Sequence, residues 1–278
     1  GTLLAAMCSP LVLFELPRTT WRYLLIYLVA GFAVMGGAGY LLATHRAELS
    51  SALYAFLFPS SWHTAVDILV DTFLAEQTRL LFVNLVIQAS LQLVTLTLFP
   101  IKELVSASYE RDASLVSVAQ KEHPLWKQGL QELQYFLLFL GVYGLVFLIG
   151  REGGAWRSAL ALVLSYGWLF FTFAVDFVAP LFQRHEGHYS QIYKTLLARL
   201  PATLCFGALF AIPSMVAAAL WAAHPEWSLP AALAVVFGAN LIGVAWAAVS
   251  GTYLAAVLFP VFRERERSNV VLRWGGSL

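Results

Sequence analysis

Long apolar runs alternate with short polar connections along the chain, and each run is about as long as a membrane-crossing helix. A helix needs about 20 apolar residues to cross a hydrocarbon core of about 30 Å, and only helices and closed barrels satisfy their backbone inside lipid. The pattern therefore predicts an all-α membrane protein, with residues 1–278 as a single polytopic transmembrane domain. Its six hydrophobic segments are Trp21–Ala43, Arg79–Phe99, Leu130–Ile149, Arg157–Phe182, Thr203–Ala223 and Leu229–Phe262.

Two of the predicted helices are longer than one upright span. Residues Ala65–Glu110 read as one helical pattern broken only at Pro100, and at about 1.5 Å per residue such a helix reaches about 70 Å. We therefore expect this long second helix to extend into the cytoplasm. The last run is either strongly tilted or a full span followed by a partial insertion. A small residue at every fourth position of this run lets another helix approach closely, at Ala239, Gly243, Ala247, Gly251 and Ala255.

The third and fourth runs are joined by the short, glycine-rich connection Gly150–Trp156. This hairpin either crosses the bilayer fully or inserts partway and returns as a re-entrant helix pair. Re-entrant pairs are allowed in lipid where other parts of the protein cover their exposed backbone. The sequence leaves both alternatives open.

Positive charge gathers on one side of the predicted spans. With the connections assigned to alternate sides, thirteen of the seventeen Lys and Arg residues share the side of both termini, three lie opposite, and Arg79 lies within the second run. The positive-inside rule then places both termini in the cytoplasm, with the chain as a multi-pass protein of a bacterial-type inner membrane. A composition of 60% hydrophobic residues points to the lipid bilayer as partner, and a net charge of +1 argues against nucleic acid.

One face of the second predicted helix is lined with amides. Asn84, Gln88 and Gln92 fall, with Gln77 and Thr95, within an arc of about 80° at about 100° per residue, and Lys102 lies on the same arc if the helix continues. The bland interpretation is hydrogen bonding to another helix. The functional interpretation is one wall of a polar pathway, with Lys102 attracting anions at its cytoplasmic mouth.

A carboxylate stands near the cytoplasmic end of the fourth run, at Asp176. Carboxylates inside a membrane are costly and need a partner, which Arg184, Arg199 or Lys102 could supply. We expect a structural ion pair between Asp176 and Arg184, with a proton carrier as the alternative. Asn240 in the last run is either a helix contact or a second pathway group.

Motifs for covalent or cofactor chemistry are absent from the sequence. We find no phosphate-binding glycine loop, nucleophile elbow, zinc motif or flavin fingerprint, so we expect a protein that is not an enzyme and uses no cofactor. Cys8 and Cys205 lack metal-ligand spacing, so no metal site is expected. His185 and His188 are expected to be solvated in a charged loop.

Several landmarks follow one another in a characteristic order. The stretch Gly1-Thr-Leu-Leu4 and Pro10 precede a pair of arginines, and Leu98 to Glu110 carries Pro100 at the exit of the long second helix. Gln131-Glu-Leu-Gln-Tyr-Phe136 leads into an apolar hairpin. Asp176-Phe177 with Pro180, a basic stretch to Arg199, and Phe206-Gly207 followed by Pro213 complete the series. This order resembles the CysZ-type sulfate permeases, a family grouped with the eukaryotic etoposide-induced membrane proteins.

The resemblance implies a permease that passes a small inorganic oxyanion, most directly sulfate, without a nucleotide cofactor. It also implies long helices with partially inserted helix pairs, and a homo-oligomer. The N-terminal segment becomes a candidate anion site through its free helix amides, at Gly1, Thr2, Leu3 and Leu4. The alternative function is a non-catalytic scaffold or accessory subunit of a larger membrane complex. An intramembrane enzyme lacks a supporting nucleophile or metal cluster.

Overall fold

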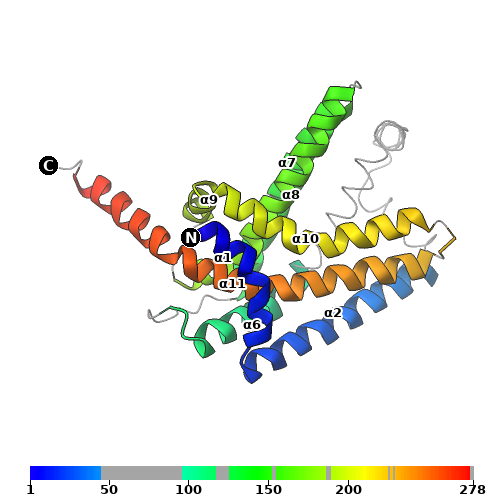
Figure 1. Cartoon of the computed structure of the whole chain (residues 1–278), viewed down its shortest axis with the longest axis horizontal. Helices are drawn as coiled ribbons and strands as arrows, with labels where there is room; N and C mark the ends of the chain where they lie inside the picture. The colour runs from blue at the N-terminus through cyan, green and yellow to red at the C-terminus, as the bar shows by residue number, and fades with distance from the viewer. Residues whose placement is uncertain are drawn as a thin grey trace.

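The computed structural model of the chain describes residues 1–44, 96–116, 125–151, 155–185, 189–224, 226–227 and 229–275. Every element in these ranges is helical, as the periodicity predicts, and η1 is a 3₁₀ helix (Figure 1). The elements are α1 (Thr2–Cys8), η1 (Ser9–Glu15), α2 (Arg18–Thr44), α6 (Phe99–Asp112), α7 (Leu125–Arg151), α8 (Ala155–Arg184), α9 (Tyr189–Leu197), α10 (Leu200–Ala223) and α11 (Leu229–Gly275).

Three helical stretches of the described chain are long and apolar enough to cross a bilayer. They lie in α7, α8 and α11, at Glu132–Gly150, Ala159–Arg184 and Gly238–Arg263. A fourth is obtained if α9 and the first part of α10, which meet at 98°, count as one broken span. The protein thus has the helices of a multi-pass membrane protein. Of the predicted second run, only residues 96–99 lie within the described ranges.

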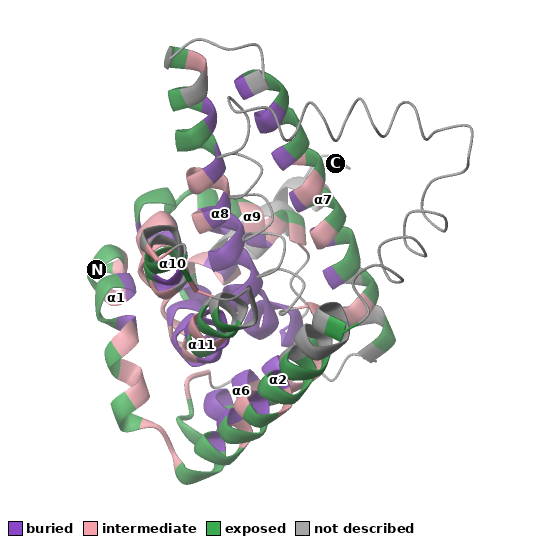
Figure 2. Ribbon diagram, turned by 90° about the vertical axis from the view of Figure 1, so that its right-hand side faces the viewer, coloured by how far each residue is buried: buried purple, intermediate pink, exposed green. Residues whose placement is uncertain are grey.

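The long helices run in two directions. α7 and α8 lie side by side as a hairpin that rises away from the other helices, whereas α10 and α11 run together across it (Figures 1 and 2). Large apolar side chains such as Leu137, Leu145 and Val163 are exposed along the hairpin. Such a surface suits lipid rather than water, because exposed apolar patches of this extent are rare on soluble monomers.

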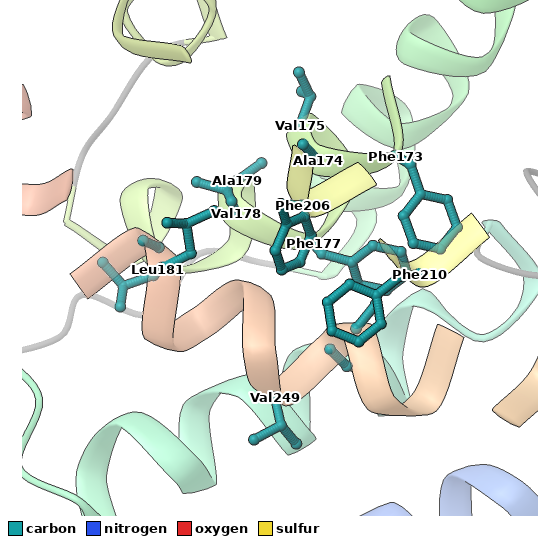
Figure 3. Close-up of a cluster of buried hydrophobic side chains, with 14 of the residues drawn as sticks. Phe173, Ala174, Val175, Phe177, Val178, Ala179, Leu181, Phe206, Phe210 and Val249 are labelled. Carbon is teal, nitrogen blue, oxygen red and sulfur yellow. The ribbon is translucent and has the colours of Figure 1, made fainter. Parts of the chain in front are cut away.

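The two sets of helices meet at the C-terminal half of α8. Every residue from Phe171 to His185 is buried, and Figure 2 shows this stretch enclosed by the neighbouring helices. Aromatic rings fill the junction: Phe173 and Phe177 have centroids 4.8 Å apart, and Phe206 and Phe210 of α10 repeat the same spacing. Figure 3 shows the four rings gathered together, whereas the side chain of Val249 of α11 is directed away from them. The core therefore lies at the base of the hairpin.

Glycines allow the helices to approach closely at this junction. A Cβ added to Gly207 of α10 would lie 1.9 Å from the backbone oxygen of Phe170 in α8, and one added to Gly251 of α11 would lie 2.6 Å from the oxygen of Phe177. Gly243 packs in the same way against Phe210. The predicted close approach along the small residues of the last run is confirmed.

α6 begins where the sequence predicts a break. Leu98 is in a turn after helical residues 96–97, and Pro100 occupies the first turn of α6, where its missing N–H costs no hydrogen bond. However, α6 does not project from the protein. Val105 and Tyr109 are buried, and the helix packs against α2, α8 and α11. The polar side chains of α6 find partners on other helices, and the expected extension of this helix into the cytoplasm stays a prediction.

The last run forms part of one uninterrupted helix. α11 has 47 residues, which at about 1.5 Å per residue gives about 70 Å, and it continues through Pro260. The sequence leaves two alternatives for this run, a strongly tilted helix or a full span followed by a partial insertion. Because α11 is continuous, the second alternative is excluded. A single helix longer than the hydrocarbon core remains.

The N-terminal segment packs against α11 halfway along its apolar stretch. Trp246 donates its indole N–H to the carbonyl of Pro10 at 2.9 Å, and Ser250 donates its hydroxyl to the carbonyl of Ser9 at 2.9 Å. The opposite side of this segment is apolar and exposed, with Leu4 at 65% and Phe14 at 78%. If Gly238–Arg263 crosses the bilayer, Ser9 and Pro10 lie near its middle.

Candidate functional site

A buried lysine joins three helices. The Nζ of Lys102 lies 2.6 Å from Oδ1 of Asp176 and 3.2 Å from Oε1 of Glu132, and the three residues are 1%, 2% and 7% exposed. Lys102 comes from α6, Glu132 from α7 and Asp176 from α8. The ammonium also donates to the backbone oxygen of Asp176 at 3.4 Å and lies 5.5 Å from the ring centre of Phe177. We call Lys102, Glu132 and Asp176 the lysine cluster.

The local sequence explains why these charges can be buried. Lys102 lies in the first turn of α6, fixed by its backbone N–H bonding to Leu98, and Glu132 opens the apolar stretch of α7. Burial alone would lower the pKa of Lys102, but Asp176 and Glu132 outweigh it and raise the pKa above its ordinary value. The lysine therefore remains an ammonium ion inside the protein.

An arginine builds a second ionic group next to the first. The guanidinium of Arg184 donates to Glu103 at 2.5 Å, to Glu110 at 2.8 Å and to Ser106 at 2.8 Å, and its Nη2 lies 2.7 Å from the same oxygen of Glu110. His185 lies with Nε2 at 2.6 Å from the other oxygen of Glu110. We call Arg184, Glu103, Glu110 and His185 the arginine cluster. It fastens the end of α8 to one face of α6.

Electrostatics favour the ionised form of Glu110 in the arginine cluster. Burial raises the pKa of this carboxyl, but the hydrogen bond from His185 and the charge of Arg184 outweigh burial and lower the pKa below its ordinary value. Ser106 extends the contacts to α11 through a 2.6 Å hydrogen bond with Thr252. Polar groups thus connect α6, α8 and α11 across the interior.

A third polar contact links α6 to α2. Asp112 accepts hydrogen bonds from Thr19, from Ser108 at 3.2 Å and from Thr20 at 3.5 Å. The hydrogen bond from Thr19 is the main reason that the pKa of Asp112 is lowered. α6 is therefore held on each side by a different helix, which fixes the position of Lys102.

The structure changes the expected ion pairing. Asp176 does form a buried ion pair, but its partner is Lys102, whereas Arg184 binds Glu103 and Glu110. The expected Asp176–Arg184 pair is therefore wrong, because α6 inserts its own lysine and glutamates along α8. His185 is 3% exposed, so its expected solvation is wrong as well.

Lys102 also differs from its expected place at an open mouth. Its side chain is buried between two carboxylates, so little of its positive field reaches solvent. Asn84, Gln88 and Gln92 lie outside the described residues. The structure thus brings Lys102 and Asp176 together, and adds Glu132 from the polar lead Gln131 to Phe136, which no sequence pattern marks as an ion-pair partner.

The candidate anion site at the N-terminus lies mostly on the surface of the protein. Gly1, Leu3 and Leu4 are exposed and Thr2 is half-buried in α1, which has seven residues and packs against α10 and α11. Lys102 lies on α6, which packs against α2, α8 and α11. Within the described ranges, no three His, Cys, Asp or Glu side chains are grouped to hold a metal ion.

Comparison with known proteins adds no assignment to this picture. No family model matches the chain, and no curated protein matches it. What the chain does is accordingly inferred from its own apolar helices and buried charges.

Proposed function

We propose that the chain is an integral membrane permease for a small inorganic oxyanion, with sulfate as the substrate that the resemblance to CysZ-type permeases implies. The observation that carries the proposal is the lysine cluster, where α6, α7 and α8 meet beside stretches able to cross a membrane. The positive-inside bias places both termini on the cytoplasmic side of an inner membrane.

Buried charges favour a transport function over a purely structural one. Replacing a buried ion pair by apolar residues of similar volume is often neutral or stabilising, so stability alone does not explain three charged side chains at one point. Ionisable groups within membrane helices commonly mark substrate and ion pathways. Asp176 lies eight residues before the end of α8, about 12 Å inside that end at about 1.5 Å per residue.

Lys102 is the group that we assign to the oxyanion. Its ammonium is paired with the carboxylates of Asp176 and Glu132, so the described arrangement corresponds to a site closed to anions. An oxyanion can replace a carboxylate at Lys102 only after that carboxylate moves away or gains a proton. The lysine cluster would thus act as a gate inside the pathway, while the amides at Asn84, Gln88 and Gln92 remain the proposed pathway wall and Gly1–Leu4 the proposed capture segment.

The second candidate function is a scaffold in a larger membrane complex. It is favoured by α11, whose C-terminal part extends away from the other helices (Figure 1). About 70 Å of helix is more than the hydrocarbon core needs, and an extension of this kind suits contact with another subunit.

Sulfate flux into proteoliposomes separates the two functions. We expect flux through the wild-type chain, loss of most of that flux in Lys102→Gln, and partial retention in Lys102→Arg, which keeps the positive charge. Lys194→Gln is the matched control, because Lys194 is exposed on α9. Each variant is first checked by size-exclusion chromatography, where a folded protein elutes as a single species. Flux equal to empty liposomes in the wild type contradicts the permease and favours the scaffold.

A further inference from the structure

The lysine cluster carries more negative than positive charge. One ammonium, Lys102, lies between two carboxylates, Glu132 and Asp176, and all three are at least nine-tenths buried. Among the described residues, Lys102 is the one cation that contacts either carboxylate. With both carboxylates ionised, the cluster would hold one uncompensated negative charge out of contact with water. Such a charge is costly, and proteins normally neutralise it with a proton or a counter-ion.

Unpaired polar atoms lie around the same carboxylates. Oδ1 of Asp176 accepts from Lys102, but Oδ2 is buried and has no hydrogen-bond partner among the described residues. The hydroxyls of Tyr27 and Tyr193 are likewise buried and unpartnered within the described chain. Glu132 and Asp176 also interact with each other. A carboxylate oxygen that lacks a partner gains a hydrogen bond when a neighbouring carboxylate is protonated.

Among the described residues, the neighbouring groups do not supply the missing positive charge. Tyr27 of α2, Tyr135 of α7, and Tyr189 and Tyr193 of α9 all lie within electrostatic reach of Asp176, and each is neutral as a phenol. α6 contributes Lys102, whose charge is already counted. α10 and α11 place apolar surface against this part of α8, including Phe206 (Figure 3) and the backbone of Gly251, which lies against Phe177.

A proton suits this position better than a metal cation. A sodium ion on Oδ2 of Asp176 would lie beside the ammonium that is 2.6 Å from Oδ1 of the same carboxylate, and the two positive charges would repel. A proton is instead absorbed into a covalent O–H bond and leaves a neutral carboxyl group. That O–H can donate to the free carboxylate oxygen or to a tyrosine hydroxyl.

We propose that Glu132 and Asp176 together form an exchangeable proton-binding site, holding one proton between them while Lys102 neutralises the remaining charge. Uptake of the proton from hydronium converts one carboxylate to a carboxyl group and releases water, and the charge of the cluster changes from −1 to zero. The site is a property of the folded chain, so it exists whether or not the protein carries an oxyanion.

Infrared spectroscopy of the lipid-reconstituted protein tests the site without a transport assay. We expect a carbonyl band of a protonated carboxyl group at neutral pH that shifts in D₂O and disappears as pH rises. Glu132→Gln and Asp176→Asn should each remove the band, because the remaining carboxylate then pairs with Lys102 as an ion. Glu226→Gln, at an exposed position, is the control and should leave the band unchanged.

Three outcomes would overturn the proposal. The first is a folded wild-type protein with no protonated carboxyl band at neutral pH, a result that does not depend on either variant folding. The second is a band that survives in both folded variants and so belongs to another residue. The third is a band that is lost when choline is replaced by sodium, which would assign the site to the metal cation. None of these results decides whether sulfate is transported.

Discussion

At the residue scale, Lys102 differs from a surface charge in how salt should affect it. Screening by salt acts on charges that face solvent, and the Debye length falls from about 10 Å at 0.1 M to about 3 Å at 1 M. Lys102 is 1% exposed and held between two carboxylates. We therefore predict that the flux lost in Lys102→Gln changes little with ionic strength, measured as sulfate uptake at low and high salt. A defect that vanishes at high salt would mean that Lys102 acts from an open mouth.

Glu110 gives the fold a defined dependence on acid. Its pKa is lower in the folded protein than the ordinary value of 4.5, because His185 and Arg184 favour the ionised form more than burial opposes it. The ionised carboxylate therefore stabilises the fold above the unfolded pKa, and this stability is lost as pH falls through the folded pKa. We predict that Glu110→Gln lowers the unfolding midpoint at neutral pH and flattens its decline in acid.

The matched control for Glu110 is Glu226, which is exposed on the connection before α11. Thermal unfolding in detergent is followed across the acidic range for the wild type, Glu110→Gln and Glu226→Gln. Breaking a buried pair by removing one partner costs about 3–5 kcal/mol, so the unfolding midpoint of Glu110→Gln should lie clearly below that of Glu226→Gln at neutral pH. Identical acid profiles in all three proteins would mean that Glu110 contributes no pH-dependent stability.

At the scale of elements, the tightest helix contact depends on one missing methyl group. A Cβ at position 207 would lie 1.9 Å from the backbone oxygen of Phe170, which is too close for any side chain. We predict that Gly207→Ala destabilises the protein by about 1–3 kcal/mol, because α10 must move away from α8. Gly167→Ala is the control: it has nothing within 4 Å, and alanine favours a helix over glycine by about 1 kcal/mol. Equal unfolding midpoints would contradict the close contact.

The sequence predicts the elements better than their partners. The apolar runs at Leu130–Ile149 and Arg157–Phe182 correspond to α7 and α8, because apolar length alone specifies a helix in lipid. The partner of Asp176 could not be deduced in this way. Lys102 and Arg184 both lie at plausible helical positions, and the choice between them depends on how α6 packs, which no local pattern records.

Glu132 and His185 show the same limit from the other direction. A glutamate at the start of an apolar helix and a histidine next to a charged loop both resemble solvated residues in sequence. Each is buried by a contact with a distant residue: Glu132 contacts Lys102, which is 30 positions away, and His185 contacts Glu110, which is 75 positions away. A useful signal for Glu132 was its position at the edge of an apolar stretch, where a charge needs either water or a partner.

For the whole molecule, the crossing of two helix sets restricts how it sits in a bilayer. The α7–α8 hairpin runs across the direction of α10 and α11 (Figures 1 and 2). A flat bilayer cannot be perpendicular to both sets, so at least one set is strongly tilted or inserts partway. The bend of 98° between α9 and α10 fits the second description. Within the part of the chain that the structure describes, the helices therefore do not all cross upright.

The contact between the N-terminal segment and α11 has a consequence for how the protein is made. Ser9 and Ser250 are 241 positions apart, and at about 5–20 residues per second a ribosome needs roughly 12–48 s to synthesise that length. During this interval the apolar side chains of Thr2–Glu15 have no α11 to pack against. α1 can pack against α10 as soon as that helix has been made, whereas Ser9 and Pro10 must wait for Ser250 and Trp246 of α11. A chain stopped before Trp246 would therefore have α1 in place but leave η1 without its partner on α11.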